Sequence, residues 1–351
     1  MRAEDKPTPA RRWLESAPRP PKFAVPASRE AWEERRAEIR AELQGLLGRM
    51  PARPKVPIAE TLSREDRGDY FLERFRFDNG AGSMVPGYLL VPKGASAGNP
   101  AILYCHWHGG EWDLGKEELF HAKHMPEAPG PALARRGFVV LAIDAPGFGE
   151  RNGSGPGGPD ERNGPAEETA AKLNLWLGRT SWGMMLRDDL MALDYLVSRP
   201  EVDAGRIGAT GMSMGATRTW WLMAMDERIQ SGVAVACMTR CENLALSDGI
   251  HEHGIYYFVP GMLRHFDTEA VISLIAPRPI LFQNGDQDSG SPVDGIRAIG
   301  EAVKPAYYLY GREDAFQSLV YPGLGHSYTR EMWEKTHAWV LDRLGLPASN
   351  T

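Results

Sequence analysis

The strongest constraint on the fold is a set of six short, almost purely apolar runs in the second part of the chain. The runs lie at 101–105, 138–143, 207–210, 232–236, 280–282 and 317–320. Helical patterns, for example Trp182–Ser198 and Ala216–Asp226, separate most of them. A strand that is buried on both faces has no polar face and therefore reads as a continuous apolar run. Such strands alternating with helices predict a parallel sheet that helices cover on both faces.

Two segments ahead of these runs predict an antiparallel addition to the sheet. Tyr70–Phe77 and Met84–Val91 alternate apolar and polar residues, and the turn sequence Asp78-Asn79-Gly80 lies between them. The fold class that follows is α/β, with a mostly parallel mixed sheet of about eight strands. Further upstream, Ser28–Leu47 has the pattern of an N-capped helix. We therefore expect residues 1–60 to form an arm and a helix that pack on one large domain of residues 61–351.

Two stretches interrupt the alternation of strands and helices. Residues 145–181 are crowded with Gly and Pro, and residues 238–272 follow one predicted strand but return to the sheet only at Ile280. Both stretches leave the region where the carboxyl ends of the strands should lie, which is where ligands bind in open α/β sheets. We expect these two insertions to shape a substrate site.

The composition narrows the range of partners and compartments. The chain of 351 residues carries a formal net charge of -6, which predicts neither a basic surface nor a nucleic-acid partner. No apolar stretch approaches the ~20 residues that span a bilayer, so we expect no membrane partner. The start Met1–Lys6 is charged and no apolar segment follows it, unlike a signal peptide. The default compartment is therefore cytoplasmic, although a secreted or periplasmic protein whose signal has been removed would begin in the same way.

The three cysteines do not predict a disulfide framework, because their number is odd and Cys105 lies inside an apolar run. A single Cys237–Cys241 bridge stays open at this stage. The oligomeric state is not predicted by any pattern in the chain.

The most specific local motif is Gly211-Met212-Ser213-Met214-Gly215, between the apolar run 206–210 and the helical pattern 216–226. This is the pattern of a nucleophile elbow, a tight strand-to-helix turn that exposes a serine. Glycines two residues to either side allow the backbone segments to approach closely. Ser213 is therefore the predicted nucleophile. The N–H of Met214, at the helix start, is predicted to stabilise the oxyanion of the intermediate.

A serine nucleophile needs a base, and the base needs a third group that orients it. The last apolar run leads into Gly325-His326, so His326 is the predicted base. The run at 280–282 leads into Gly285-Asp286-Gln287-Asp288, which offers two carboxylates. The spacing to Pro292 favours Asp288 as the triad acid and leaves Asp286 to brace the turn, and both assignments remain open.

The loop after the first apolar run, Cys105-His106-Trp107-His108-Gly109-Gly110, predicts the second oxyanion donor, for which we choose the N–H of Gly110. His106 and His108 are two residues apart and share a strand face, so metal binding is the rival interpretation. The Asp and His that usually follow in hydrolytic metal sites are absent after His108, and we predict no metal and no cofactor. Four residues of this loop and of the first insertion and its border are candidate substrate contacts: Trp107, Glu150, Arg151 and Trp182.

On these motifs the chain resembles the α/β-hydrolase superfamily over roughly residues 85–345, and within it the dienelactone-hydrolase-like and acetylxylan-esterase-like serine esterases. The stretches that carry the resemblance are 104–110, 144–151, 187–208, the elbow, and the acid and histidine turns. The resemblance implies a catalytic domain with a Ser-His-Asp mechanism and no cofactor. Dienelactone hydrolases have cysteine at the elbow and glucuronoyl esterases have arginine directly after the serine, whereas this chain has Ser213 and Met214.

The expected function is therefore a serine carboxylesterase that acts through an acyl-enzyme on a small-molecule or saccharide ester. Acetyl or aromatic-acyl esters of plant polysaccharide are candidate substrates. Two alternatives are a peptidase of the prolyl-oligopeptidase kind and a non-catalytic binding module on a hydrolase scaffold. About 100 residues precede the predicted catalytic strands, which is too few for the repeated blades of that peptidase family. An intact set of serine, acid and histidine argues against the binding module.

Overall fold

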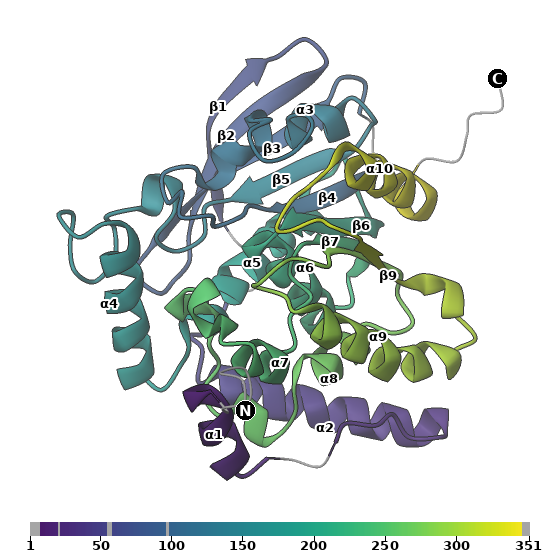
Figure 1. The fold of residues 1–351 in the computed structure, drawn as a ribbon. Helices are drawn as coiled ribbons and strands as arrows, with labels where there is room; N and C mark the ends of the chain where they lie inside the picture. Colours follow the sequence, from purple (N-terminus) through teal and green to yellow (C-terminus); the bar gives the residue numbers. More distant parts are fainter. Residues whose placement is uncertain (1–7, 20–21, 55–57, 96–97, 346–351) are drawn as a thin grey trace.

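A single nine-stranded sheet with helices on both faces forms the centre of the molecule (Figure 1). The computed structural model describes residues 8–19, 22–54, 58–95 and 98–345. The strand order is β1-β2-β3-β5-β4-β6-β7-β8-β9. The strands are β1 (Ala59–Asp66), β2 (Tyr70–Asp78), β3 (Met84–Pro92), β4 (Asn99–Cys105), β5 (Val139–Ile143), β6 (Val202–Met212), β7 (Ile229–Val235), β8 (Ile280–Gly285) and β9 (Phe316–Tyr321).

The sheet is parallel from β5 to β9 and antiparallel at its other end. The strands from β5 to β9 pair in parallel with one another, in the order β5-β4-β6-β7-β8-β9. β1, β2 and β3 pair antiparallel, and β3 joins the sheet by pairing antiparallel with β5. The predicted α/β class and mixed sheet are confirmed. The strand beyond the predicted eight is β1, an edge strand with no fully buried residue. Its sequence Ala-Glu-Thr-Leu-Ser-Arg-Glu-Asp has no apolar run that marks it as a strand.

Helices form one layer on each face of the sheet. One face carries α5 (Ser181–Ser198), α6 (Met214–Met225), α8 (Thr268–Ser273) and α9 (Val293–Tyr308), and the other carries α3 (Pro129–Ala134) and α10 (Arg330–Leu344). Each face has its own cluster of buried apolar side chains, as expected of a sheet covered on both sides. Among the helices of the described ranges, none is long and apolar enough to cross a bilayer.

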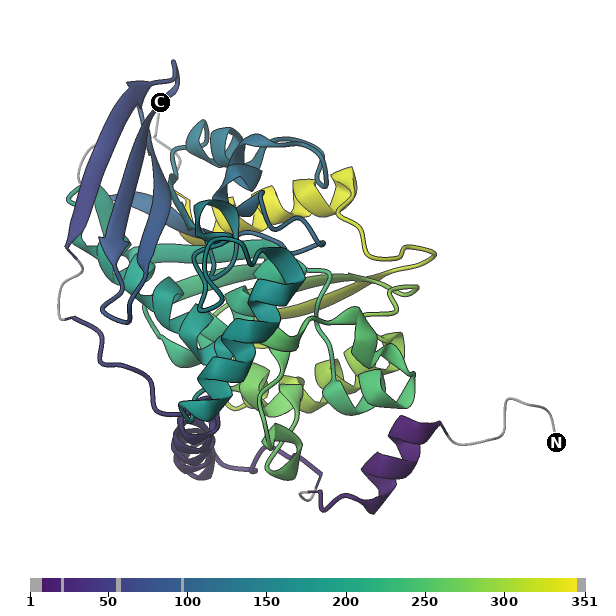
Figure 2. The same ribbon diagram turned by 90° about the vertical axis from the view of Figure 1, so that its left-hand side faces the viewer.

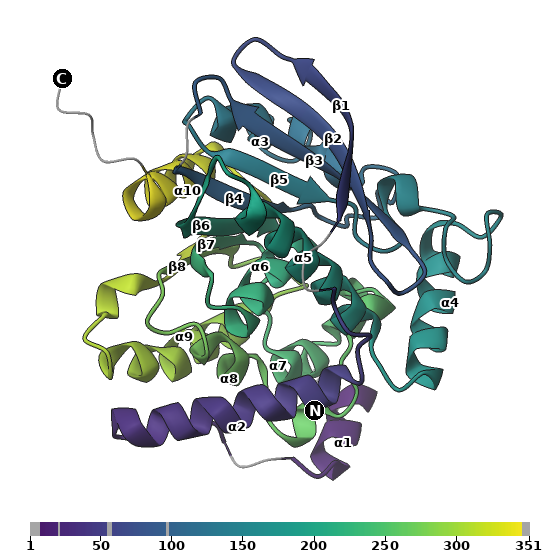
Figure 3. The same cartoon turned by 180° about the vertical axis from the view of Figure 1, so that it is seen from behind.

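The N-terminal part of the chain lies outside the helical layer of the α5 face (Figure 3). α2 (Arg29–Leu47) begins after the N-cap Ser28, whose hydroxyl accepts from the Ala31 N–H. It buries Trp32, Ile39 and other apolar side chains in the core of that face. Ahead of it, α1 (Pro9–Ser16) is a short peripheral helix with no buried residue (Figure 2). Residues 1–7 and 20–21 of the predicted arm lie outside the described residues.

Both insertions contain helices that stand at the carboxyl ends of the parallel strands. The first follows β5 and contains the 3₁₀ turn η3 (Gly149–Arg151) and the helix α4 (Asn163–Trp176). The second follows β7 and contains α7 (Cys241–Leu246) and the 3₁₀ turns η4 (Gly249–Glu252), η5 (Ile255–Tyr257) and η6 (Met262–Arg264). α4 packs against η5, so the two insertions meet above the sheet edge. The sequence pattern does not predict most of α4, because the helix buries only Ala166 and Ala171.

The three cysteines are free thiols. Cys105 and Cys237 are buried, and Cys241 is partly exposed. The Cys237–Cys241 bridge that the sequence left open is therefore not formed. Burial raises the pKa of the Cys105 thiol to about 12 and that of the Cys237 thiol to about 11. Thiols this weakly acidic are poor nucleophiles, so neither cysteine competes with serine chemistry at the sheet edge.

Candidate active site

Ser213 lies in a strained turn between β6 and α6. Its backbone has φ 58° and ψ -120°, a combination that residues with a side chain rarely adopt. The turn brings the flanking glycines against the end of β4, where a Cβ on Gly211 or Gly215 would lie 2.3 Å or 2.0 Å from the carbonyl oxygen of Cys105. Only glycine fits at these two positions. The elbow motif thus forces the Ser213 side chain out beyond the end of the sheet.

The start of α6 places an electropositive backbone next to Ser213. Met214 is the first residue of the helix, and the first N–H groups of any helix have no partner within it. The positive end of the helix dipole points in the same direction. The N–H of Ser213 itself is used in the sheet, since it donates to the Val235 carbonyl at 2.9 Å. The N–H of Met214 is therefore a suitable donor to an anion formed beside Ser213.

His326 and Asp288 form a hydrogen-bonded pair on the loops after β9 and β8. Nδ1 of His326 lies 2.7 Å from Oδ2 of Asp288. The Asp288 side chain is buried, and its Oδ1 accepts from the Gly290 N–H at 3.0 Å. The two loops approach so closely that a Cβ on Gly285 would lie 2.1 Å from the Leu324 carbonyl oxygen. A glycine at the end of β8 is therefore required for the histidine loop to reach the acid.

Asp286, the other carboxylate of this turn, faces away from His326. Its Oδ1 accepts from the backbone N–H of Gly323 at 2.7 Å and from the Gln287 side chain at 3.1 Å. Its own N–H donates to the Tyr321 carbonyl at 3.1 Å. These bonds tie the end of β8 to the end of β9. Of the two carboxylates, the structure brings Asp288 to His326 and leaves Asp286 to hold the two turns together.

Ser213, Asp288 and His326 line one cavity of about 360 Å³. Its lining includes Met214 of the elbow, Cys237 and the loop 108–110 after β4. Another wall comes from the second insertion. The insertion residues that line the cavity are Glu252, His253, Gly254 and Tyr256. The cavity collects residues from five loops that follow parallel strands, as expected for a ligand site in an α/β sheet.

The loop predicted to supply the second oxyanion donor has an internal hydrogen bond that the sequence does not reveal. The N–H of Gly110 donates to Nδ1 of His108 at 3.0 Å. Nε2 of His108 in turn lies 2.9 Å from Oε2 of Glu167, in α4 of the first insertion. Gly110 lines the cavity, but its N–H already has an acceptor within the protein. An oxyanion would have to take this N–H over from His108.

His106 is a structural residue rather than an exposed ligand. It is fully buried, its Nδ1 lies 2.8 Å from the Trp107 carbonyl, and its Nε2 accepts from the Ala145 N–H at 3.0 Å. Burial and the nearby Arg218 guanidinium hold the pKa of His106 well below its usual range. Both ring nitrogens are thus engaged with backbone. Across the part of the chain that the structure describes, no group of three or more His, Cys, Asp or Glu side chains has a metal-binding arrangement.

Two buried acidic groups support the loop after β4 from below. Glu118 accepts from the Trp107 N–H at 2.7 Å and from the Tyr104 hydroxyl at 2.8 Å. Burial raises the pKa of Glu118 to about 7. The second group, Asp189, forms a fully buried ion pair with Arg218 of α6 at 2.5 Å and 2.9 Å. The arginine also donates to the His106 carbonyl at 3.3 Å and so links the nucleophile helix to the loop.

The four candidate substrate contacts lie outside the Ser213 cavity. The expectation for Trp182 is corrected, because its indole is fully buried and packs among Trp221, Tyr256 and Tyr257.

Trp107 packs beneath Gly109 and against the His124 ring, at 3.6 Å between ring centres. Glu150 pairs with Lys116 at 2.5 Å, and the same lysine binds Asp144.

Arg151 is buried and pairs with Asp188 at 2.8 Å. It lines a separate cavity of about 340 Å³ between the β2–β3 turn, α4 and α5. Tyr256 and Glu167 line this cavity too, and Tyr256 also lines the Ser213 cavity. Arg151 is therefore near the site but on the far side of Tyr256.

The sequence predicts that the second insertion shapes the site, but it does not single out His253 and Glu252 as residues of the cavity wall. His253 stacks on Tyr257 at 4.4 Å between ring centres, and its Nε2 lies 2.8 Å from the Gly290 carbonyl. Oε1 of Glu252 accepts from the Ser289 hydroxyl at 2.7 Å. Both side chains thereby hold the turn that carries Asp288. The sequence offers only a polar cluster at 251–253, with no periodicity that would place it.

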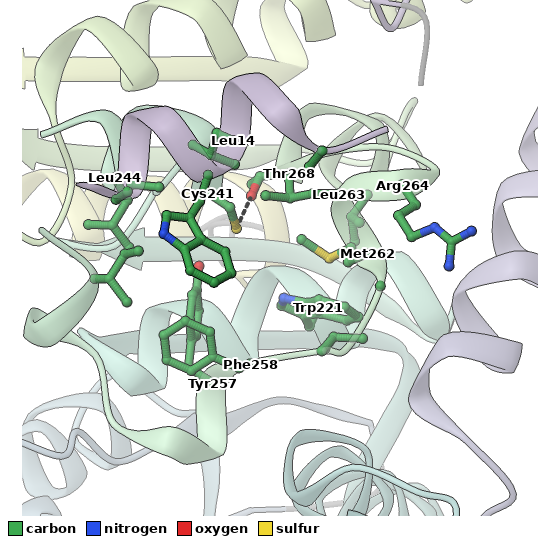
Figure 4. Close-up of a pocket in the computed structure, with 18 of the residues that line it drawn as sticks. Leu14, Trp221, Cys241, Leu244, Tyr257, Phe258, Met262, Leu263, Arg264 and Thr268 are labelled. Carbon is green, nitrogen blue, oxygen red and sulfur yellow. Dashed lines mark hydrogen bonds between the residues drawn. The ribbon is translucent and has the colours of Figure 1, made fainter. Parts of the chain in front are cut away.

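An apolar cavity of about 530 Å³ lies between α1 and the second insertion (Figure 4). Leu14 of α1 faces Trp221, Met262 and Phe258 across it, and Cys241 contacts Thr268 at its wall. Ser213, Asp288 and His326 are not among its lining residues. Tyr257 lies between the two cavities, with His253 on its other face. This apolar cavity is therefore distinct from the one that contains the serine.

The chain is similar to known proteins over most of its length. A family model described as the abhydrolase family matches residues 14–340. The Bacillus subtilis protein named "Putative hydrolase YtaP" is 36% identical over 296 residues, which cover 84% of this chain and 95% of that protein. "Uncharacterized peptidase YuxL" of the same bacterium is 23% identical over 74% of this chain, but over only 36% of its own length. A solved structure from Bacteroides fragilis, described as a "putative acetyl xylan esterase", has a TM-score of 0.71 at 18% identity, covering 97% of this chain and 89% of that one.

Proposed function

The chain belongs to the abhydrolase family, whose members are hydrolases with an α/β-hydrolase fold, and we propose that it is a serine carboxylesterase with Ser213 as nucleophile. The family membership confirms the resemblance drawn from the sequence motifs.

The proposal rests on the observation that Ser213, His326 and Asp288 line the same cavity. Asp288 accepts from Nδ1 of His326, which leaves Nε2 of the same ring free to act as a base. The strained turn exposes Ser213 in the same cavity of about 360 Å³. A serine hydroxyl becomes a good nucleophile only with such a base beside it.

The reaction that these groups support is acyl transfer in two steps. The Ser213 oxygen attacks the ester carbonyl carbon while Nε2 of His326 takes the hydroxyl proton. The Met214 N–H stabilises the oxyanion, and the Gly110 N–H joins it by leaving His108. The alcohol departs with the proton from His326, and water then attacks the acyl-serine along the same route. Asp288 stabilises the imidazolium in both steps.

The cavity favours a small acyl group and a polar alcohol. Among its walls, only Tyr256 and Met214 present large apolar side chains, whereas Glu252, Ser289 and His253 present polar groups. The solved structure of similar fold from Bacteroides fragilis is described as a "putative acetyl xylan esterase". We therefore propose an acetyl ester of a small molecule or saccharide as substrate, with an aromatic-acyl ester as the second candidate.

The two alternatives to an esterase are a peptidase and a non-catalytic binding module. A peptidase is favoured by the similarity to YuxL, although this chain spans only 36% of that protein. A binding module without catalysis would need none of the hydrogen bonds that orient His326. Measuring hydrolysis of acetyl, aromatic-acyl and peptide p-nitroanilide substrates, each with Ser213→Ala as the control, separates the three. The esterase predicts cleavage of the acetyl ester that Ser213→Ala abolishes. Cleavage of peptides alone, or of nothing, would contradict it.

A further inference from the structure

The side chains of Glu167 and His108 connect the first insertion to the loop that supplies the second oxyanion donor. They are largely buried, with 13% and 15% of their side-chain surfaces exposed, and Oε2 of Glu167 lies 2.9 Å from Nε2 of His108. The other ring nitrogen, Nδ1, receives the Gly110 N–H at 3.0 Å. We propose that Glu167 is a positioning residue that fixes the tautomer of His108 and, through it, the direction of the Gly110 N–H. This inference rests on the proposed serine esterase function.

The hydrogen bonds determine which ring nitrogen carries the proton. A backbone N–H can only donate, so Nδ1 of His108 must be the unprotonated nitrogen that accepts from Gly110. A neutral imidazole then has its proton on Nε2, where the Glu167 carboxylate accepts it. With the opposite tautomer, two donors would face each other at Gly110. The carboxylate therefore stabilises the one tautomer that allows the loop to keep its shape.

The ring of His108 cannot escape this choice by turning. Tyr256 stacks on it at 5.1 Å and 21°, while Trp112 and Phe148 meet it edge-on at 5.1 Å and 5.0 Å. Aromatic contacts on three sides hold the ring plane in place. Only the position of the proton remains variable, and Glu167 is the polar side chain that contacts Nε2.

Glu167 is itself held where three segments meet. It belongs to α4 of the first insertion, it contacts the loop after β4 through His108, and it lies against the second insertion at Gly254. A Cβ on Gly254 would lie 2.6 Å from Oε1 of Glu167, so a glycine at this position leaves the space that the carboxylate occupies. Glu167 thus connects the first insertion to the oxyanion loop through a hydrogen bond.

The consequence for catalysis is a preorganised donor. The lone pair of Nδ1 holds the Gly110 N–H in place beside the Ser213 cavity, which both residues line, and the stronger acceptor that forms in the reaction, an oxyanion, then takes it over. Loss of the acceptor at Nε2 leaves a buried N–H without a partner and admits the other tautomer, which repels the Gly110 N–H. The loop must then turn away. Because the oxyanion exists only after attack, the loss should lower kcat and leave KM nearly unchanged.

Three variants of the full chain test this with matched controls. Glu167→Leu removes the acceptor, and we expect kcat to fall at least about tenfold with KM within about twofold. Glu167→Gln keeps an oxygen that can accept from Nε2, and its kcat should stay within about threefold of the parent. Glu168→Leu changes the exposed neighbour on the same helix, which pairs only with Lys172 at 3.3 Å, and should leave kcat unchanged. A fall in kcat of equal size in all three would overturn the proposal.

Two further measurements distinguish positioning from a purely structural role. Long-range ¹H–¹⁵N spectra of histidine-labelled protein should show the Nε2–H tautomer for His108, assigned with His108→Asn, and a shift toward Nδ1–H in Glu167→Leu. In the His108→Asn variant, the amide oxygen of Asn can accept from the Gly110 N–H, and an amide has no tautomer for Glu167 to fix. Adding Glu167→Leu to that variant should therefore lower kcat by less than about twofold further. An unchanged His108 tautomer in Glu167→Leu, or the same tenfold loss in both backgrounds, would overturn it. The spectra do not depend on ester cleavage, so a failure of the esterase proposal would be recognised separately, by Ser213→Ala keeping full activity.

Discussion

The backbone N–H of Trp107 donates a 2.7 Å hydrogen bond to Glu118, a carboxyl group that is buried beneath the oxyanion loop. The second oxygen of Glu118 accepts from the Tyr104 hydroxyl. This acid therefore fixes the start of the loop that carries His108 and Gly110. Because burial favours the protonated form of Glu118, the stability of the fold should fall as the pH rises.

The pKa of Glu118 is raised by burial from 4.5 to about 7, so the folded protein retains this proton over a range in which the unfolded chain has lost it. Stability from the protonated acid is fully present below pH 4.5 and is lost as the pH rises toward 7. Relative to Glu118→Gln, which does not titrate, the parent should lose on the order of 2–3 kcal/mol of unfolding free energy between pH 4.5 and 7. Urea unfolding of both proteins across that range measures the difference. Parallel pH profiles for parent and variant would contradict this.

Because Asp189 and Arg218 form a buried ion pair, removing the charge of one partner alone should strongly destabilise the fold. Asp189→Asn leaves the Arg218 charge buried without a counter-charge, and we expect a loss of about 3–5 kcal/mol of unfolding free energy. The double variant Asp189→Leu with Arg218→Met removes both charges and should be more stable than Asp189→Asn. Thermal and denaturant unfolding of the two variants decide this. A single variant within about 1 kcal/mol of the parent would show that the pair is not needed.

A side chain added at a glycine of the elbow should destabilise the fold, whereas one added at Gly300 should stabilise it. A Cβ on Gly215 would lie 2.0 Å from the Cys105 carbonyl oxygen, so Gly215→Ala should destabilise the fold by several kcal/mol and abolish ester hydrolysis. Gly300, inside α9, has no atom within 4 Å of the Cβ position. Gly300→Ala should therefore raise stability by roughly 0.5–1 kcal/mol. Denaturant midpoints test both, and a well-folded, active Gly215→Ala protein would be inconsistent with the geometry of the turn.

The two acids after β8 should respond differently to the same substitution. Asp288→Asn removes the charge beside the His326 imidazolium and permits the wrong tautomer, which we expect to lower kcat by about four decades. Asp286→Asn keeps an oxygen that can accept from the Gly323 N–H, so it should cost only about 0.5–2 kcal/mol of stability and little activity. Steady-state kinetics and unfolding midpoints of both variants decide the assignment. If Asp286→Asn abolishes turnover while Asp288→Asn is nearly normal, the two roles are exchanged.

The parts of the fold that the sequence predicts well are those encoded by contiguous residues. The elbow, the acid turn and the Gly325-His326 turn each follow an apolar strand directly, so their places at the sheet edge follow from the strand order. β1 was missed because it is an edge strand with little apolar surface, and α4 because only two of its residues are buried.

The rest of the site depends on contacts between residues far apart in sequence. The Glu167–His108 bond spans 59 positions and the His253–Gly290 contact spans 37, and no local pattern indicates either. Trp182 was assigned to the substrate because it borders an insertion, but an aromatic residue at the start of a helix serves equally well in the core. The sequence does not predict that His108 accepts from the Gly110 N–H, because this bond depends on the conformation of the loop and residue types alone do not determine that conformation.

The covalent labelling of Ser213 tests the central claim most directly. The protein should be incubated with a fluorophosphonate, digested, and examined by mass spectrometry, with Ser213→Ala and His326→Gln as controls and circular dichroism to verify their fold. We expect one adduct, on the peptide that contains Ser213, which is absent in Ser213→Ala and forms far more slowly in His326→Gln because the base that activates the hydroxyl is gone. Ester hydrolysis by Ser213→Ala should fall by roughly four or more decades in kcat. An adduct on another residue, or unchanged hydrolysis by Ser213→Ala, would contradict the assignment of Ser213 as the nucleophile.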